Sequence, residues 1–552
     1  MGIYSRHRRR SPKLEAGLDI RAALDALGAE ELRSFVIEAL GGLDEGLRGQ
    51  LQDALLRRAS AANVGWRPAA PAKGIVDEVG NFVVAARRAG AADPSQVDDY
   101  LRQGVKASLA GDHESASAIF ESLLAPIADA EFDLGQHETV DEVLSVDLND
   151  CVARYLAAVY VTTPLAARAD RVFEALGSRE GLAYVREPLL AIEGVLGGDI
   201  PDIEQFLPLW IASLERGRKP ASEWETDQDR WLREAVARKD GIVGLERIAR
   251  TTKQPQAVRA WCDVVVAAGD WSKSLAAYAV AAELVPSPTW RGDFLDGAAL
   301  AAEVLKRKDA AKRLEVAWLG APSLGRMLRW LLAEEPSAAT VKRRAATALQ
   351  ASSTKSARLL GLLHVLVHDI PAAAALLKKA PGLGWSSGDH PGHLLFPVFA
   401  WMLGEPPSGS VRAGIVEVLN RPVASEPDRG VPARDDGDGA TTSTPHLARY
   451  AVLEALRRAQ VIENLTAADQ GMVLAAMKAA AEKRTDGVLG EKRRRHYDHA
   501  AQLIACCVES EGQVDGTGCS AWAEDIRART SHFPAFQQAL RKALAQVRRA
   551  PE

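Results

Sequence analysis

The stretch AGDHESASAIFESLL, residues 110–124, decides the fold predicted for this chain. Gly111 and Asp112 predict a tight turn that ends one helix and starts another. Ala116 and Phe120 follow four residues apart, which places a small and a large side chain on one helical face. The stretch therefore predicts the second half of a helical hairpin.

Two further stretches repeat this pattern, AGDWSKSLAAYAVAAELVP (268–286) and VHDIPAAAALLKKAP (367–381). In each, an aspartate at a turn precedes a helix that stops at a proline. The residues expected to pack the three hairpins are Ala116, Phe120, Ser274, Tyr278, Ala281, Ala373 and Leu377. Alternating small and large residues resemble the second helix of a tetratricopeptide (TPR) repeat, where small side chains let the partner helix approach closely.

The composition favours helix throughout the chain. Hydrophobic residues make up 47% of the 552 residues and charged residues 26%, whereas aromatic residues make up only 6%. We therefore expect an all-α protein, a degenerate TPR-like helical-hairpin solenoid with a small C-terminal helical domain. The copies are irregularly spaced and Leu377 replaces the aromatic residue of the third copy, so ordinary helix pairs in a globular α domain stay open as an alternative.

Breaks in the helical pattern divide the chain into five predicted parts. They are a basic flexible arm (1–16), an N-terminal helix pair (17–62), the TPR-like solenoid (75–421), a flexible linker rich in Pro, Gly, Asp, Ser and Thr (422–446), and the C-terminal helical domain (447–552). No apolar run is long enough to span a membrane, and the five cysteines form no CxxC pair. We therefore expect a cytoplasmic protein without membrane contact.

Two stretches of the C-terminal part, RRRHYDHAAQLIACCVES (493–510) and SHFPAFQQALRKAL (531–544), suggest a family. Together with GWSSGDHPGHLLFP (384–397), they resemble the α-helical region of bacterial proteins that carry a SWIM zinc finger. The resemblance implies a bacterial protein with a helical scaffold. The Cys-x-Cys and Cys-x-His zinc ligands of that finger are absent from this sequence, so its zinc site is not carried over.

The stretch GWSSGDHPGH (384–393) is the strongest candidate for chemistry. Ser386 stands at the centre of a GxSxG pattern, but a nucleophile elbow needs a preceding strand and a helical pattern precedes it here. His390 and His393, with Asp389, offer three zinc ligands, although a Pro-Gly turn separates the two histidines. We predict no catalytic residue, cofactor or metal, and keep a hydrolase or metal site at 384–393 as an alternative.

Two charged stretches are candidates for partner binding. Residues 107–153 contain eleven acidic residues and no Lys or Arg, and Asp129, Glu131 and Asp133 lie at their centre. Such a segment attracts a basic partner, but most acidic runs are simply solvated faces. Conversely, Arg493, Arg494 and Arg495 form a basic run that suits phosphate groups. The net charge of −5 gives no overall basic field, so nucleic acid is a minor expectation.

These features together predict a non-enzymatic protein–protein interaction scaffold or adapter that binds one or more proteins. The alternative is a regulated component of a bacterial conflict, stress or defence system, in which the linker 422–446 is cleaved to release the C-terminal helices.

Overall fold

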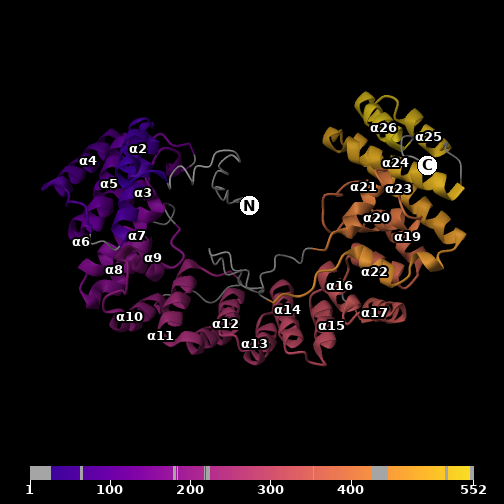
Figure 1. The fold of residues 1–552 in the computed structure, drawn as a ribbon, viewed down its shortest axis with the longest axis horizontal. Coiled ribbons are helices and arrows are strands. Elements are labelled where there is room, and N and C mark those ends of the chain that lie inside the picture. The colour runs from indigo at the N-terminus through magenta and orange to yellow at the C-terminus, as the bar shows by residue number, and fades with distance from the viewer. Residues whose placement is uncertain are drawn as a thin grey trace. The chain divides into compact units, whose positions relative to one another are not determined.

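The computed structural model describes a helical protein (Figure 1). Its described residues are 26–62, 66–137, 139–177, 182, 184–216, 218, 224–351, 354–423, 445–515 and 520–547. Within these residues every regular element is an α-helix or a short 3-10 helix, so the all-α class is confirmed. None of the described helices is both long and apolar enough to cross a membrane.

The chain divides into two compact units, Met1–Gly244 and Leu245–Glu552, a division that the sequence did not indicate. Helices of the first unit are α2 (Ala29–Gly41), α3 (Glu45–Ala61), α4 (Ile75–Ala89), α5 (Pro94–Ala110), α6 (His113–Ala128), η1 (Val140–Glu142), α7 (Leu148–Thr162), α8 (Leu165–Gly177), α9 (Pro188–Leu196) and α10 (Ile203–Glu215). Helix α11 (Asp227–Thr252) passes from the first unit into the second. It is kinked at Gly241, whose φ of +57° and ψ of −140° are not helical.

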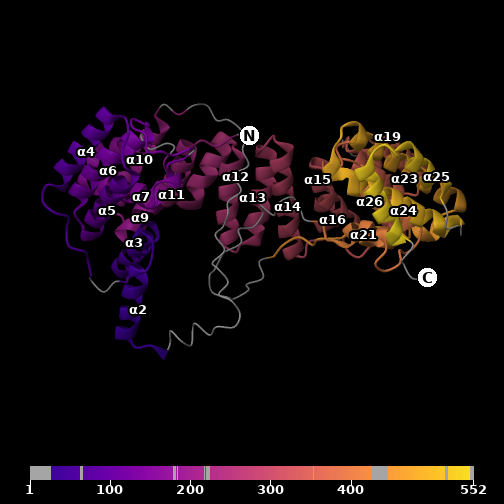
Figure 2. The same cartoon turned by 90° about the horizontal axis from the view of Figure 1, so that it is seen from above.

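The second unit continues with short, consecutive helices. They are α12 (Pro255–Ala267), α13 (Trp271–Leu284), α14 (Pro288–Val304), α15 (Ala310–Gly320), α16 (Leu324–Leu332), α17 (Ala338–Ala351), α18 (Ala357–Leu366), α19 (Ile370–Lys379), α20 (Gly392–Met402), α21 (Val411–Val416), η2 (Glu417–Asn420), α22 (Val452–Arg458), η3 (Ile462–Asn464), α23 (Ala467–Gly490), η4 (Arg494–His496), α24 (Tyr497–Asp515), α25 (Ala521–Arg529) and α26 (Pro534–Val547). From α12 to α19, each helix packs against the next one in the chain. Figure 2 shows α12, α13 and α14 side by side in this order.

Three helix pairs, α5–α6, α12–α13 and α18–α19, are joined by turns of one design. A residue with left-handed backbone ends the first helix, and an aspartate then accepts a hydrogen bond from a backbone N–H of the second helix. The left-handed residues are Gly111, Gly269 and His368, with φ of +83°, +77° and +67°. The aspartates are Asp112, Asp270 and Asp369, which accept from the N–H three residues on at 3.1, 3.0 and 3.2 Å. These are the turns of the three sequence stretches.

The seven residues predicted to pack the hairpins are all buried. Two of them lie directly on a glycine of a neighbouring helix. A Cβ atom built on Gly104 of α5 would be 2.7 Å from the Phe120 ring of α6, and one built on Gly297 of α14 would be 2.5 Å from the Tyr278 ring of α13. Each ring therefore needs a neighbour without a side chain, which sets how closely the two helices approach.

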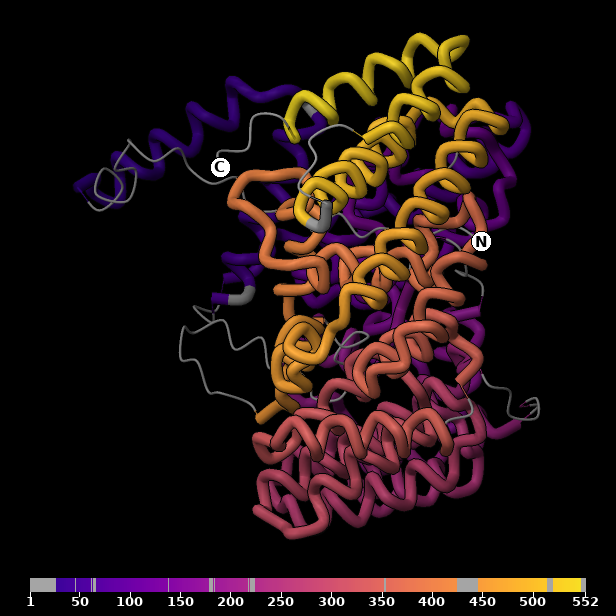
Figure 3. The backbone as a smooth tube through the Cα atoms, turned by 90° about the vertical axis from the view of Figure 1, so that its right-hand side faces the viewer, coloured from indigo at the N-terminus to yellow at the C-terminus, as the bar shows by residue number. Residues whose placement is uncertain are grey.

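The C-terminal helices share a core with the helices that precede them. One hydrophobic cluster runs from Ala299 in α14 to Ala543 in α26. Helix α23 packs against α19 and α20, and α24 packs against α21, α23 and α26. Figure 3 shows the orange and yellow helices of the second unit lying against one another. Residues 422 and 451 are also joined, because the Val423 N–H donates to the Tyr450 carbonyl at 3.0 Å. The predicted C-terminal domain therefore does not form a separate core in the described residues.

Two further predictions concern the N-terminal part of the chain and the linker. The arm 1–16 and residues 424–444 of the predicted linker lie outside the described residues. In the predicted pair 17–62, the structure describes α2 and α3, which contact each other. Helix α2 contains no buried residue, and Phe35 and Ile37 are 56% and 71% exposed.

A half-buried carboxylate holds the start of α9 in the first unit. Glu234 of α11 accepts hydrogen bonds from the backbone N–H groups of Leu189 and Leu190 at 3.1 and 2.7 Å. Burial nevertheless raises the pKa of Glu234 from its ordinary value of 4.5 to about 7, and the two N–H groups only partly oppose this.

Substituting Gly104→Ala should destabilise the first unit, because the new methyl group would overlap the Phe120 ring. We expect a loss of about 1–3 kcal/mol in the free energy of unfolding. The control is Gly80→Ala in α4, where a Cβ atom would meet nothing within 4 Å. That variant should gain about 0.5–1 kcal/mol from its better helix propensity. Urea unfolding followed by circular dichroism measures both, and equal effects would contradict the packing of Phe120 on Gly104.

The raised pKa of Glu234 predicts a pH-dependent stability. Because the folded state holds this proton more tightly than the unfolded state, the free energy of unfolding should fall as the pH rises from 4.5 to about 7. We expect Glu234→Gln to remove a fall on the order of 2 kcal/mol. The measurement compares urea unfolding of both proteins across this pH range, and parallel curves would show that Glu234 does not titrate there.

Candidate functional site

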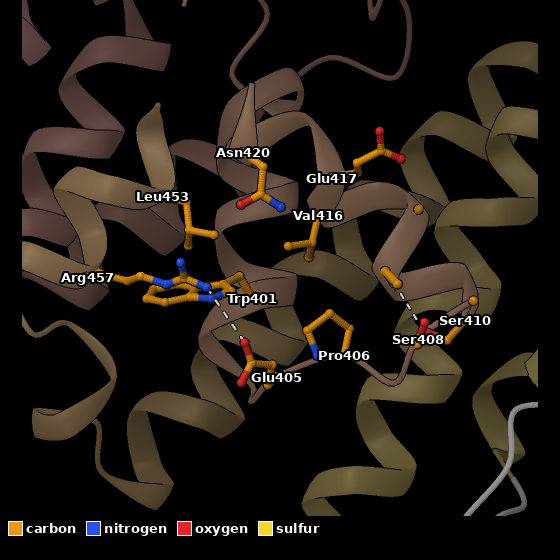
Figure 4. A pocket seen from close by; sticks show the side chains of 13 residues that line it. Trp401, Glu405, Pro406, Ser408, Ser410, Val416, Glu417, Asn420, Leu453 and Arg457 are labelled. Carbon is orange, nitrogen blue, oxygen red and sulfur yellow. Dashed lines mark hydrogen bonds and ion pairs between the residues drawn. The ribbon is translucent and has the colours of Figure 1, made fainter. Parts of the chain in front are cut away.

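A pocket with a cavity volume of about 470 Å³ lies in the second unit. It is formed by the end of α20, the loop 403–410, α21, η2 and α22 (Figure 4). Its size is within the range of about 300–1,000 Å³ that is usual for ligand pockets. The pocket is therefore large enough for one or two amino-acid side chains or a small molecule.

The apolar part of the pocket comes from three different helices. Trp401 of α20, Val416 of α21 and Leu453 of α22 line the pocket, and each of these residues is almost completely buried. Their side chains belong to the same hydrophobic cluster as the rest of the second unit. The apolar surface of the pocket is thus fixed by core packing.

The polar part of the pocket carries charges of both signs. Glu405 and Arg457 face each other, with an ion pair of 3.7 Å between Nη2 and Oε1 (Figure 4). Glu417 also lines the pocket and pairs with Arg421 at 3.0 Å. Because all four of these side chains are exposed, the pairs contribute little to stability and can rearrange around a ligand.

A completely buried arginine holds the loop that forms one wall. Arg412 has 0% exposure, and its guanidinium donates to the carbonyl oxygens of Leu403 and Glu405 at 3.4 and 2.9 Å. It also donates to Oε1 of Gln513 at 2.9 Å, and its Nε lies 3.8 Å from the Glu509 carboxylate. Both Glu509 and Gln513 belong to α24, so the loop is fastened to a helix about one hundred residues further along the chain.

The same carboxylate also positions the start of α21. Oε2 of Glu509 accepts the backbone N–H of Arg412 at 3.0 Å, and the Ser410 side chain caps the helix by accepting the N–H of Ala413 at 3.1 Å. Burial lowers the pKa of Arg412, and the Glu509 charge opposes this shift. Gly404 and Gly409 bend the loop with φ of +112° and +77°. The pocket wall is therefore set by a network of specific hydrogen bonds.

The candidate stretch 384–393 is a turn between α19 and α20. Ser386 is exposed, and the element before it is helix α19 and not the strand that a nucleophile elbow requires. His390 is buried; its Nδ1 accepts the N–H of Gly392 at 3.1 Å, and its Nε2 lies 2.9 Å from the Pro381 carbonyl oxygen. In the part of the chain that is described, no three His, Cys, Asp or Glu side chains are placed to hold a metal ion. These two hydrogen bonds indicate a structural role for His390, which joins Pro381 and Gly392 at the two ends of the turn.

The structure places the charged candidates in different units. Asp129, Glu131 and Asp133 are exposed residues of the first unit, after α6. Glu131 pairs with Arg87 of α4, and the Asp133 carboxylate accepts the N–H of Gly135 at 2.8 Å. The acidic stretch is thus partly neutralised by arginines from outside it, including Arg171, which pairs with Glu121.

The basic candidates belong to the second unit. Arg493, Arg494 and Arg495 are exposed in the connection between α23 and α24. Arg493 lies 4.0 Å from the Glu491 carboxylate, and Arg495 donates to the His496 ring at 3.1 Å. This run is therefore accessible to an anionic ligand.

Sequence reasoning did not find the pocket. Trp401 and Leu453 resemble ordinary core residues, and Arg412 and Glu509 are 97 residues apart. The only local signal was an arginine in the largely apolar stretch VRAGIVEVL (411–419), which contains one other charged residue, Glu417. Such an arginine indicates a buried ion pair when the segment is expected to be in the core.

Substituting Arg412→Met should destabilise the second unit by about 3–5 kcal/mol, because it leaves the buried Glu509 carboxylate without its partner. The control is Arg421→Met, which removes an exposed ion pair and should change stability by less than about 0.5 kcal/mol. Thermal unfolding followed by circular dichroism compares the two variants. A similar effect of both substitutions would show that the buried network does not hold the loop.

No protein-family model matches the chain, and no curated protein matches it.

Proposed function

We propose that this protein is a non-enzymatic protein–protein interaction scaffold built on a TPR-like α-solenoid. Its pocket between α20, α21 and α22 receives an apolar side chain from an extended segment of a partner protein. The observation that carries the proposal is the pocket itself, with an apolar floor, a rim of both charges and a rigid wall. The apolar floor suits a large apolar side chain of the partner, and the charged rim suits the polar backbone on both sides of that side chain.

The repeated turn supports the solenoid. Three helical hairpins share the left-handed turn residue, the aspartate cap and a buried face, although their sequences differ. Helices α12 to α19 also pack in chain order, which is the arrangement that lets hairpins stack. Scaffolds of stacked hairpins offer extended surfaces for other proteins.

The rigidity of the wall supports peptide binding at the pocket. Since Arg412 and Glu509 already fix the loop 403–410, a ligand need not order it. Binding to a preformed surface costs less conformational entropy than binding to a mobile one. The exposed pairs Glu405–Arg457 and Glu417–Arg421 can then exchange partners with charges on the bound segment.

A second surface supports an interaction role in the first unit. Helices α2 and α3 expose several large apolar side chains, including Phe35, Ile37, Leu51 and Leu55. Neighbouring exposed apolar residues on two contacting helices are uncommon away from interaction sites.

The test uses a random peptide library displayed on phage and selected against the full chain. A peptide with an apolar anchor should be enriched and should bind with a measurable Kd in isothermal titration calorimetry. Gly414→Trp should weaken it at least about tenfold, or about 1.4 kcal/mol. Gly414 lines the pocket and has open space around its Cβ position, so the indole ring would occupy the pocket.

The matched control is Gly471→Trp, at another exposed helical glycine with open space around it. This variant should bind the peptide as the unmodified chain does. The proposal is wrong if no peptide is enriched, or if the two tryptophan variants reduce binding equally.

A further inference from the structure

The connection between α19 and α20 lies directly on α23. A Cβ atom on Gly382 would overlap the carbonyl oxygen of Lys483, so the backbone of the connection touches the helix. Trp385 fills the space beside it, with its ring 4.8 Å from the His390 ring and 5.3 Å from the His499 ring of α24. The Gly382 backbone and the Trp385 ring are therefore packed against α23 and α24, whereas residues 386–389 are exposed.

Two arginines hold this connection from different helices. Arg358 of α18 donates from Nη1 to the Gly388 carbonyl at 2.6 Å, and Arg484 of α23 donates from Nη1 to the Gly382 carbonyl at 3.3 Å. In both guanidinium groups, Nε is buried and has no hydrogen-bond partner. The indole Nε1 of Trp385 and Nδ1 of His499 are likewise buried and unpartnered. Four polar side chains in this region thus retain unused hydrogen-bonding capacity.

Arg484 is the most unusual of these groups because it is only 4% exposed and lacks a counter-ion. Among the described residues, no carboxylate lies within 4.0 Å of its guanidinium. Burial lowers the pKa of Arg484, and the neighbouring charge of Arg493 lowers it further. A buried cation without an anion is costly, so a site of this kind gains stability when an anion binds.

Four histidines lie near enough to Arg484 for its charge to lower their pKa values. His390 is buried, His496 and His499 are half-buried and His393 is exposed. Burial lowers the pKa of each ring, to about 4 for His499, and Arg484 lowers all four further. Arg358, Arg493 and Arg495 add to this positive environment.

Two acidic residues near this cluster, Asp389 and Glu491, interact with arginines other than Arg484. Burial lowers the pKa of Arg358 and the Asp389 charge only partly opposes this, while Glu491 lies 4.0 Å from Arg493. Neither forms an ion pair with Arg484 in the described part of the second unit. The positive charge of Arg484 therefore stays without an ion pair in the described residues, with Arg493 to Arg495 exposed beside it.

We propose that the cluster of Arg484, Arg358, Arg493, His496 and His499 beside Trp385 binds a phosphate monoester group. Guanidinium groups suit this ligand because they donate several charge-assisted hydrogen bonds to phosphate oxygens. A monoester carries close to two negative charges at neutral pH, which matches the uncompensated charge of the cluster better than a singly charged diester does.

The first experiment titrates the full chain with inorganic phosphate and with phenyl phosphate in a calorimeter. Saturable 1:1 binding is expected. Binding of both ligands identifies a site that accepts free phosphate, and binding of phenyl phosphate alone identifies one that requires the ester. A single-stranded RNA oligonucleotide binding while neither inorganic phosphate nor phenyl phosphate binds would overturn the proposal, as would no saturation by any of the three.

The second experiment separates the site from general charge effects. Arg493→Gln should weaken binding at least about fivefold. Arg493 is 46% exposed, so this variant should fold. The control is Arg541→Gln, an exposed arginine of α26 outside the cluster, which should leave the Kd unchanged. Equal losses in both variants would show non-specific attraction and would overturn the proposal.

A proton-linked signal gives an independent check. An anion beside the four histidines raises their pKa values. Binding of phenyl phosphate at about pH 7.5, where this ligand has already lost its second proton, should therefore be accompanied by proton uptake. The heat of binding should therefore change with the ionisation enthalpy of the buffer. His499→Gln should reduce this dependence, and the same buffer dependence in the variant and the unmodified chain would count against contact with His499.

Discussion

The ion pair between Arg412 and Glu509 is the constraint on which the second unit depends. It joins a loop after α20 to the middle of α24, and it does so inside the core, where either charge alone would be strongly unfavourable. The two groups also satisfy backbone carbonyl and N–H groups that the bend at 403–410 would otherwise leave unpaired. This interaction therefore fixes the pocket wall and adds a polar link to the hydrophobic core that joins the C-terminal helices to the preceding ones.

The helical class and the hairpin turns were predictable because their causes are local. A left-handed turn residue and an aspartate cap act within four residues, so Gly111 and Asp112 predict a turn without knowledge of the rest of the chain. Burial of Phe120 followed from its spacing on the helix. His368 replaces the glycine in the third turn, yet the aspartate after it still revealed the pattern.

The candidate site was less predictable because its contacts are long-range. Nothing in the sequence joins Arg412 to Glu509, or Gly382 to α23, since these contacts depend on how the helices stack. The same limit affected the charged stretches: residues 107–153 contain no Lys or Arg, but Glu131 meets Arg87 from another helix. His390 looked like a metal ligand, but its hydrogen bonds are to the backbone of its own loop.

The antiparallel bridge between residues 422 and 451 has a consequence for the connectivity of the chain. Residues 423 and 450 are hydrogen-bonded to each other, and the helices on both sides share one core. Cleavage anywhere between 424 and 444 would therefore produce two polypeptides that remain one folded body, with the pocket still assembled from both. The parts of the second unit before and after residues 424–444 should therefore reconstitute one folded body when they are expressed as separate chains.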